Sequence, residues 1–152
     1  MKAVIQRVKQ ANVKVGGEVI GQIGPGLLVL LAVHKNDVLA SLEQGEKMIK
    51  RMADKIINLR IFGDLDDKVN LSVKDIEGEI LVVSQFTLYG NCKKGNRPSF
   101  IESAKSEKAI LMYERFVKYI REQGINVETG EFGTMMEVEL INEGPVTMIL
   151  DL

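Results

Sequence analysis

The stretch that decides the fold is Glu79-Ile80-Leu81-Val82-Val83-Ser84-Gln85-Phe86-Thr87-Leu88-Tyr89-Gly90. Its apolar run is short enough for a buried strand and too short for an ordinary helix. We expect a strand over 80–86, so that polar side chains replace apolar ones where it ends. Strand ends of this kind are places where a rigid scaffold presents chemistry, and we expect a functional site here.

The residues that could carry chemistry in this stretch are Ser84, Gln85 and Thr87. Two hydroxyls, an amide and the N–H groups of a turning chain can together bind a carbonyl oxygen or an oxyanion. A serine or threonine nucleophile needs a neighbouring base, but the single histidine, His34, lies in a different segment. From spacing alone, the simpler interpretation is a strand that runs into a polar turn.

A second polar stretch, Asn142-Glu143-Gly144-Pro145-Val146-Thr147, separates the apolar runs 138–141 and 146–150. Proline has no N–H for a sheet ladder, so Pro145 must lie at an edge or in a loop. A cis bond is cheap only before proline, and glycine leaves room for another backbone or a ligand. Gly144 and Pro145 therefore predict a stiff corner with bare carbonyl groups, and a plain hairpin turn is the alternative.

The rest of the chain alternates strands and two helices, without a linker or an internal repeat. We expect further strands at 2–9, 13–20, 27–33, 58–62 and 69–73, the second of them bent at Gly16-Gly17. Turns are expected at 24–26 and 64–67. Near the end we expect a hairpin in which Met136, Val138 and Leu140 share one face, followed by a last strand.

Two segments have helical spacing. The first has apolar residues at 42, 49, 52, 53 and 56, and Ser41 with Gln44 matches a capping box. The second has them at 109, 113, 116, 117 and 120, and Gly124 is suited to end it. Two helices cannot cover both faces of about seven strands, so part of the sheet must pack on sheet or on another subunit.

Composition fits a compact protein and disfavours several classes. With 152 residues, 45% of them apolar and 27% charged, the chain suits one domain over 1–152 that buries a core. We find no leader-like start and no apolar run near the ~18 residues of a membrane span, so we expect a cytoplasmic protein. One cysteine, Cys92, and one histidine predict neither a disulfide nor a metal site.

The charge balance limits contact with nucleic acid. Twenty basic and twenty-one acidic residues give a net charge of −1, far from the basic excess of a general phosphate binder. Any RNA contact must be local, and the better candidate is the loop with Lys93, Lys94 and Arg97. A second basic set, at 47, 50, 51 and 55, has the spacing of a solvated helix face.

In this order, the two polar stretches resemble the signatures of the D-aminoacyl-tRNA deacylases. The similarity runs along the whole chain through the blocks 1–8, 23–30, 58–62, 94–100 and 128–133. This resemblance implies an α/β fold with a three-layer β/β/α single domain, two main helices and a homodimer. It implies D-aminoacyl-tRNA as the partner, a cytoplasmic location, and neither a cofactor nor a metal.

The resemblance also implies an activity. Members of this family hydrolyse the ester between a D-amino acid, or glycine on the wrong tRNA, and the terminal adenosine of tRNA. The matching residues are Ser84, Gln85, Phe86 and Thr87 for the pocket, Gly144 and Pro145 for a Gly-cis-Pro corner that enters the partner's pocket, and Arg7 and Met136 for positions that flank or brace the corner.

Roles follow as hypotheses. N–H groups around Phe86 and Thr87 would stabilise the oxyanion, while the corner would meet the α-amino group and block an L side chain. Thr87 as a covalent nucleophile is the competing mechanism, but it lacks a base, so the 2′-hydroxyl of the substrate is the better-placed assistant.

The sequence leaves alternatives open for the role of Arg7 and for the function of the chain. Arg7 could be an outward, solvated strand residue, and the chain could hold an aminoacyl end without cleaving it or bind an unrelated small molecule. Two positions depart from the family pattern: Thr134-Met135 replaces a small residue followed by an acid, and Asn96 replaces a common basic residue. These departures concern the rim of the pocket and the affinity for RNA.

Overall fold

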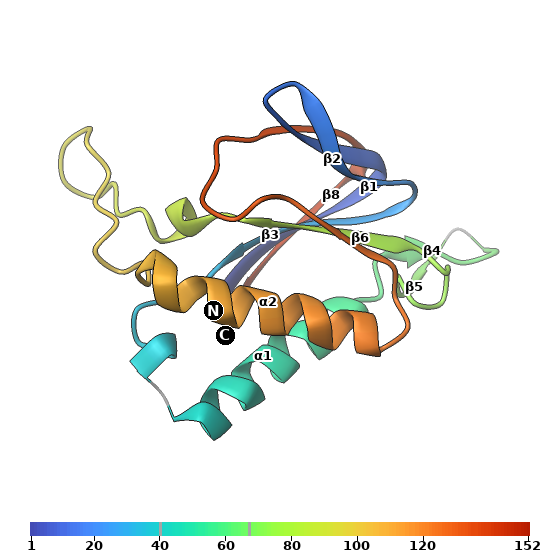
Figure 1. Cartoon of the computed structure of the whole chain (residues 1–152). Coiled ribbons are helices and arrows are strands. Elements are labelled where there is room, and N and C mark those ends of the chain that lie inside the picture. Colours follow the sequence, from blue (N-terminus) through green and yellow to red (C-terminus); the bar gives the residue numbers. More distant parts are fainter. Residues whose placement is uncertain (40, 67) are drawn as a thin grey trace.

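The computed structural model describes residues 1–39, 41–66 and 68–152. The strands are Lys2–Val15 (β1), Glu18–Ile23 (β2), Gly26–Ala32 (β3), Phe62–Gly63 (β4), Val69–Leu71 (β5), Glu79–Ser84 (β6), Val127–Thr129 (β7) and Glu137–Asp151 (β8). The helices are Leu42–Ile57 (α1) and Ser106–Glu122 (α2), and short 3₁₀ turns span Asp37–Leu39 and Phe86–Tyr89. Two long helices with a mixed sheet confirm the expected α/β class (Figure 1).

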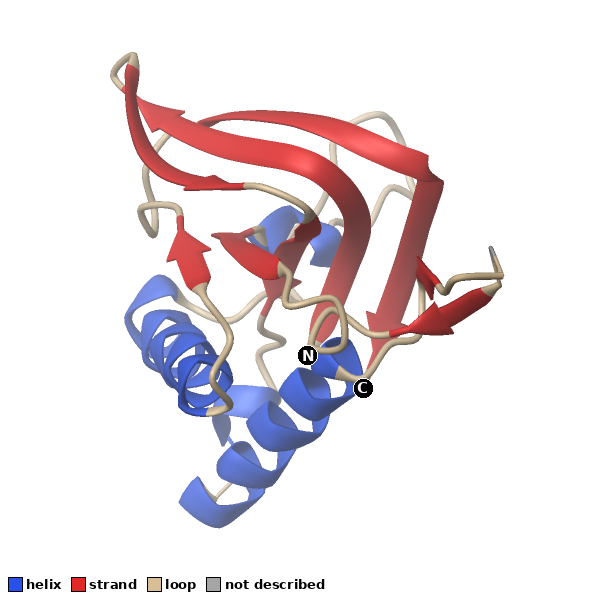
Figure 2. Cartoon of the chain, turned by 90° about the vertical axis from the view of Figure 1, so that its right-hand side faces the viewer, coloured by secondary structure: helices blue, strands red, loops and turns tan. Residues whose placement is uncertain are grey.

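The main sheet follows the order β2-β1-β3-β6-β7, and β8 also pairs with β1. β1 pairs with β3 over Lys2–Val8 and with β2 over Ala11–Val15, while β8 runs antiparallel along nearly all of β1. β6 is parallel to both β3 and β7. β1 and β8 bend together, so the sheet curls over itself (Figure 2).

Alternation along the central strands separates two hydrophobic cores. The odd-numbered residues of β3 from Leu27 to Leu31 lie in a core under the helices, whereas Leu28 lies in a second core between the folded parts of the sheet. β6 divides in the same way, with Ile80 and Val82 in the first core and Leu81 and Val83 in the second. Successive strand residues point to opposite faces. The layers are therefore sheet, sheet and helices, which confirms the expected β/β/α arrangement.

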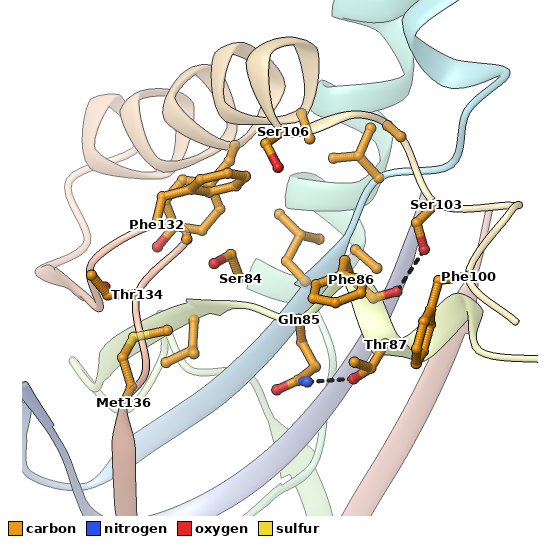
Figure 3. A pocket seen from close by; sticks show the side chains of 18 of the residues that line it. Ser84, Gln85, Phe86, Thr87, Phe100, Ser103, Ser106, Phe132, Thr134 and Met136 are labelled. Carbon is orange, nitrogen blue, oxygen red and sulfur yellow. Dashed lines mark hydrogen bonds between the residues drawn. The ribbon is translucent and has the colours of Figure 1, made fainter. Parts of the chain in front are cut away.

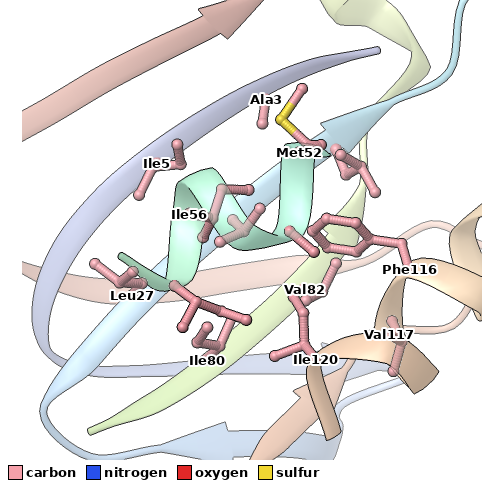
Figure 4. Packing of buried hydrophobic residues seen from close by; sticks show 14 of the residues in the cluster. Ala3, Ile5, Leu27, Met52, Ile56, Ile80, Val82, Phe116, Val117 and Ile120 are labelled. Atoms are coloured by element: carbon pink, nitrogen blue, oxygen red, sulfur yellow. The ribbon is translucent and has the colours of Figure 1, made fainter. Parts of the chain in front are cut away.

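Both helices lie on one face of the sheet and fill the first core with their apolar stripes (Figure 1). α1 begins at the predicted capping box, in which the Gln44 N–H donates to Ser41 Oγ at 3.3 Å and the Ser41 N–H donates to Gln44 Oε1 at 3.2 Å. Figure 4 shows Met52 and Ile56 of α1 in the same core as Phe116 of α2. Burying a side chain of this size stabilises the fold by about 1.5–3 kcal/mol.

Several expected boundaries were wrong. β1 does not break between 9 and 13, because its residues pair on both edges, and the chain reverses only at Gly16 and Gly17, with φ of 59° and 86°. The strand expected over 58–62 shrinks to β4, since Asn58 ends α1 with its N–H 3.1 Å from the Asp54 carbonyl. β6 ends at Ser84, so Phe86 belongs to the turn that follows.

The predicted C-terminal hairpin is also wrong as an assignment. β8 continues in one direction and pairs with β1 both before and after Gly144-Pro145. The alternation within it was right: Met136, Val138 and Leu140 pack against the second core. In the expected turn 64–67, the N–H groups of Asp66 and Lys68 each donate to Asp64 Oδ1 at 3.0 Å, and Asp67 lies outside the described residues. No helix in the described ranges is long and apolar enough to cross a membrane.

Candidate active site

A cavity of about 780 Å³ opens where β6 ends. Its walls are the ends of β3 and β6, the turn after β6, part of the segment 100–113, and the segment 132–138 (Figure 3). The turn forms because the Gln85 N–H donates to the Leu31 carbonyl at 2.8 Å and the Leu88 N–H donates to the Gln85 carbonyl at 3.1 Å. As a result, all four residues from Ser84 to Thr87 line the cavity.

Side chains fix the shape of this turn. The Gln85 amide Nε2 donates to Thr87 Oγ1, and Ser103 Oγ donates to the Phe86 carbonyl at 2.9 Å (Figure 3). Among the described residues, the backbone N–H groups of Phe86 and Thr87 have no protein acceptor. Two unused N–H donors in a fixed turn can bind an oxygen atom that gains negative charge.

The cavity offers no acid–base pair. Among its described lining residues there is no Asp, Glu or His, and the ionisable side chains are Lys105 and Tyr113. The Tyr113 hydroxyl donates to the Val82 carbonyl at 2.8 Å, and burial raises its pKa above the usual value of 10.0. His34 does not line the cavity, and its Nε2 lies 3.0 Å from Glu102 Oε2. No three Asp, Glu, His or Cys side chains gather as a metal site within the described ranges.

The second polar stretch forms a bulge in β8. Gln6 of β1 pairs with Thr147 and Val8 pairs with Asn142, so the four residues 143–146 lie opposite Arg7 alone. The Gly144–Pro145 bond is cis, and Gly144 has a φ of 124°, which favours glycine. Both residues are exposed. The hairpin-turn alternative is therefore wrong, because the strand does not reverse.

Two side chains clamp the ends of the bulge. The Val146 N–H donates to Asn142 Oδ1 at 3.1 Å. Thr147 Oγ1 accepts from Asn142 Nδ2 and from Gln6 Nε2, both at 3.3 Å. The first and last residues of the polar stretch thus hold each other while the backbone between them bulges outward.

Arg7 lies against the corner. Its Nε donates to the Glu143 carbonyl at 3.2 Å, and its Nη1 donates to the Ile61 carbonyl. A methyl group added at Gly144 would lie 3.2 Å from Arg7 Nη2 and 2.8 Å from Val146 Cγ2. Arg7 is therefore a packed, hydrogen-bonded residue and not the outward, solvated arginine that its strand also allowed.

The structure separates the predicted site residues into three places. Ser84–Thr87 and Met136 line the cavity, whereas Arg7, Gly144 and Pro145 do not. Met136 packs on Gly130, where an added methyl would lie 2.5 Å from its Sδ. Lys93, Lys94 and Arg97 lie in an exposed loop after the turn and do not line the cavity.

Other lining residues were not predicted as site residues. They come from the α2 region and from the connections before and after it: Phe100, Ser103, Lys105, Ser106, Tyr113 and Phe132. Spacing gave no signal for them, because they reach the cavity through the packing of α2 on the sheet. Phe100 and Phe132 did fall inside blocks that resemble the deacylases, which was the one available indication.

Comparisons with known proteins cover the whole chain. A family model described as D-Tyr-tRNA(Tyr) deacylase matches residues 4–151. A D-aminoacyl-tRNA deacylase of Thermosipho africanus (strain TCF52B) is 55% identical over 151 residues, 99% of this chain and 97% of that protein. A solved c-Myc DNA Unwinding Element Binding Protein has a TM-score of 0.88 and 42% identity, covering 100% and 99% of the two chains. A solved probable eukaryotic D-amino acid tRNA deacylase shares the fold, with a TM-score of 0.84, 19% identity and coverage of 99% and 98%.

Proposed function

The chain belongs to the D-Tyr-tRNA(Tyr) deacylase family, and from this membership we propose that it hydrolyses the ester bond of D-aminoacyl-tRNA. The products are the free D-amino acid and free tRNA. The supporting observation is the chemistry of the cavity, which combines two unused N–H donors and several hydroxyls with no Asp, Glu or His among its described lining residues. An aminoacyl ester is already activated, so holding the carbonyl and positioning a water can suffice.

The N–H groups of Phe86 and Thr87 stabilise the oxyanion in this proposal. The Thr87 hydroxyl accepts a hydrogen bond from Gln85 and has no base beside it, so it shapes the turn and does not attack the ester. The 2′-hydroxyl of the terminal adenosine assists the attacking water, because it lies next to an ester on the 3′-oxygen of the same ribose.

Gly144 and Pro145 select the hand of the amino acid. Their carbonyl groups receive the α-amino group, and the backbone occupies the space that an L side chain would need. Selection then works by collision with the wrong enantiomer, which is a repulsive element rather than an added attraction. Glycine carries no side chain to collide, so glycine on a wrong tRNA is also a substrate.

The corner acts on a second copy of the chain. Gly144 and Pro145 are exposed on β8 and do not line the cavity of their own chain. The β8 residues Ile141, Met148 and Ile149 flank the corner and are 50%, 40% and 69% exposed. Exposed apolar side chains on a strand that pairs on one edge suit an interface. In a two-fold homodimer each corner would enter the partner's cavity.

The RNA contact is local in this proposal. Lys93, Lys94 and Arg97 hold phosphates near the reacting end, which a chain with a net charge of −1 can do without coating RNA. A tRNA substrate also places the reaction in the cytoplasm, where charged tRNA is used.

One assay separates the proposed function from its alternatives. The protein is incubated with D-tyrosyl-tRNA and, in parallel, with L-tyrosyl-tRNA, and loss of the ester is followed over time. We expect loss of the D ester alone. Slower loss than in buffer would indicate a module that protects the aminoacyl end, and no difference from buffer for either ester would favour a small-molecule-binding protein.

A further inference from the structure

A fixed aromatic ring lies at the mouth of the cavity. Phe100 lines the cavity and is 38% exposed, and its ring meets that of Phe86 edge to face, with centroids 5.2 Å apart. Gly90 lies close against this ring, since a methyl group there would be 2.9 Å from Phe100 Cε1. Phe100 is therefore held beside Phe86 (Figure 3), and the exposed part of its surface is free to contact a ligand.

A basic loop, 91–98, ends just before Ser99 and Phe100. The N–H of Asn91 donates to the Ser99 carbonyl at 2.8 Å, and the N–H of Ser99 donates back at 3.0 Å, so the base of the loop 91–98 is closed. The loop projects from the body of the protein (Figure 1, yellow). It carries Lys93, Lys94 and Arg97 and no acidic residue. None of these cations joins an ion pair within the described ranges.

Resting on the proposed function, we infer that Phe100 and the loop 91–98 form a subsite for the unpaired nucleotide that precedes the terminal adenosine. Its base stacks on Phe100, and the loop cations hold the phosphates on either side. Single strands are bound in this way, by aromatic faces for the bases and cations along the backbone. The subsite fixes the register of the RNA end, so the ester reaches the N–H groups of Phe86 and Thr87.

A structural role for Phe100 is the competing explanation, because the ring also supports Phe86. Three esters of increasing length separate the two roles: D-tyrosyl-adenosine, the D-tyrosyl ester of cytidylyl-adenosine, and D-tyrosyl-tRNA. The first lacks the preceding nucleotide and the other two contain it. A purely supporting role lowers kcat/KM equally for all three esters, whereas a stacking role lowers it more for the longer two.

The test compares kcat/KM of four proteins on the three esters. Phe100→Leu keeps an apolar side chain against Phe86 but loses the aromatic face, whereas Phe100→Tyr keeps the face. Ile101→Ala is the matched control, because Ile101 is the adjacent apolar residue, is 74% exposed and does not line the cavity. Thermal unfolding of each variant establishes that it is folded.

Because Phe100→Leu removes the ring on which the base would stack, we expect it to lose about tenfold or more in kcat/KM on the two longer esters. Its kcat/KM on D-tyrosyl-adenosine should fall much less, so the ratio of the longer esters to the short one drops, whereas Phe100→Tyr and Ile101→Ala should keep the wild-type ratio. An equal loss on all three esters, or no loss on the longer two, would overturn the inference alone. A wild-type protein that leaves D-tyrosyl-tRNA intact would overturn the proposed function as well.

The loop is tested separately with the triple variant Lys93→Ala, Lys94→Ala, Arg97→Ala. Removing phosphate contacts should weaken cleavage of D-tyrosyl-tRNA and make its dependence on salt concentration shallower. Cleavage of D-tyrosyl-adenosine should not change. An unaltered salt dependence on D-tyrosyl-tRNA would show that the loop does not hold the RNA backbone.

Discussion

The turn at the cavity, 84–89, and the corner, 142–147, both interrupt apolar strands with polar residues, yet they are held in different ways. The turn continues from β6, whose side chains are buried in both cores. The corner is a bulge on β8, held by the side chains of Asn142, Thr147 and Arg7. In the proposed mechanism, a turn anchored on a buried strand presents the donors for the reaction, and a bulge on an exposed strand presents the group that selects the substrate. If the proposal is right, the site is complete only when two copies of the chain pair.

The largest expected effect comes from mixed dimers, which test whether the cavity of one subunit works with the corner of the other. Thr87→Pro disables the cavity by removing one N–H, and Gly144→Trp disables the corner by filling its space. Each variant alone should be nearly inactive. Co-expressed and isolated as mixed dimers, they should recover about half of wild-type activity, because each mixed dimer has one intact pair of cavity and corner out of two.

Recovery is measured on dimers purified through two different affinity tags, with D-tyrosyl-tRNA as substrate. Co-expression of each variant with itself under both tags is the control. If the mixed dimers stay as inactive as the parents, the corner acts within its own subunit or not at all.

The next effect separates the backbone of the turn from its hydroxyl. Thr87→Pro loses an N–H that has no protein acceptor, and proline is tolerated in the first turn of a helix. Loss of one oxyanion donor typically lowers kcat by about 10²–10³-fold. Thr87→Ala keeps the N–H and should lower kcat by less than about tenfold. If Thr87→Ala abolishes turnover in a folded protein, the threonine is a nucleophile after all.

A smaller effect is expected from Gly144→Ala. The added methyl would lie 2.8 Å from Val146 Cγ2, and alanine is strained at a φ of 124°, so the corner must move. We expect the ratio of kcat/KM for D- and L-tyrosyl-tRNA to fall by about tenfold, or ~1.4 kcal/mol.

Gly124→Ala is the matched control for this substitution. Gly124 has a φ of 82° but no atom within 4 Å of an added methyl, so it suffers the backbone strain without the contacts. Gly124→Ala should lower the stability and leave the ratio unchanged. If both variants change the ratio equally, the corner has no special part in selection.

The parts of this protein that could be predicted from sequence are those that local patterns specify. The capping box of α1 and the alternation at the start of β8 need only residues close in sequence. The bulge at Gly144 could not be read from its own residues, because it exists only through the register of β8 against β1. The same residues in a chain without that partner strand would be read as a hairpin turn.

Local sequence patterns also predict only part of the cavity lining. Ser84 to Thr87 could be predicted because an apolar run ends there, and the family resemblance added Met136. Phe100 and Tyr113 reach the cavity from a loop and from α2, and neither position differs in pattern from an ordinary apolar residue. Packing between distant elements placed them, and spacing along the chain does not encode that packing.

The smallest effects are expected from removing one hydroxyl group at the cavity and one at the corner. Tyr113→Phe leaves the buried Val82 carbonyl without its donor and should lower the free energy of unfolding by about 1–2 kcal/mol, with no change in the D-to-L ratio. Thr147→Val removes the acceptor of two 3.3 Å hydrogen bonds at the exposed corner. It should cost less than about 1 kcal/mol and change the ratio a few-fold. Urea unfolding and the two-substrate assay give both quantities.

The pH dependence of the Tyr113→Phe difference sharpens this contrast. Burial raises the pKa of Tyr113 above 10.0, so the phenol stays neutral in the folded protein at a pH where the unfolded chain ionises. The contribution of Tyr113 to stability is complete below about pH 10 and is lost as the pH rises above that value, because the unfolded state gains from ionisation. The stability difference between wild type and Tyr113→Phe should therefore be constant up to about pH 10 and shrink as the pH rises from about 10 to about 12. Tyr89, whose pKa is also raised by burial, is present in both proteins and cancels. A difference that stays constant over this range would mean that Tyr113 is accessible to water, and the cavity wall would then be no more firmly anchored than the corner.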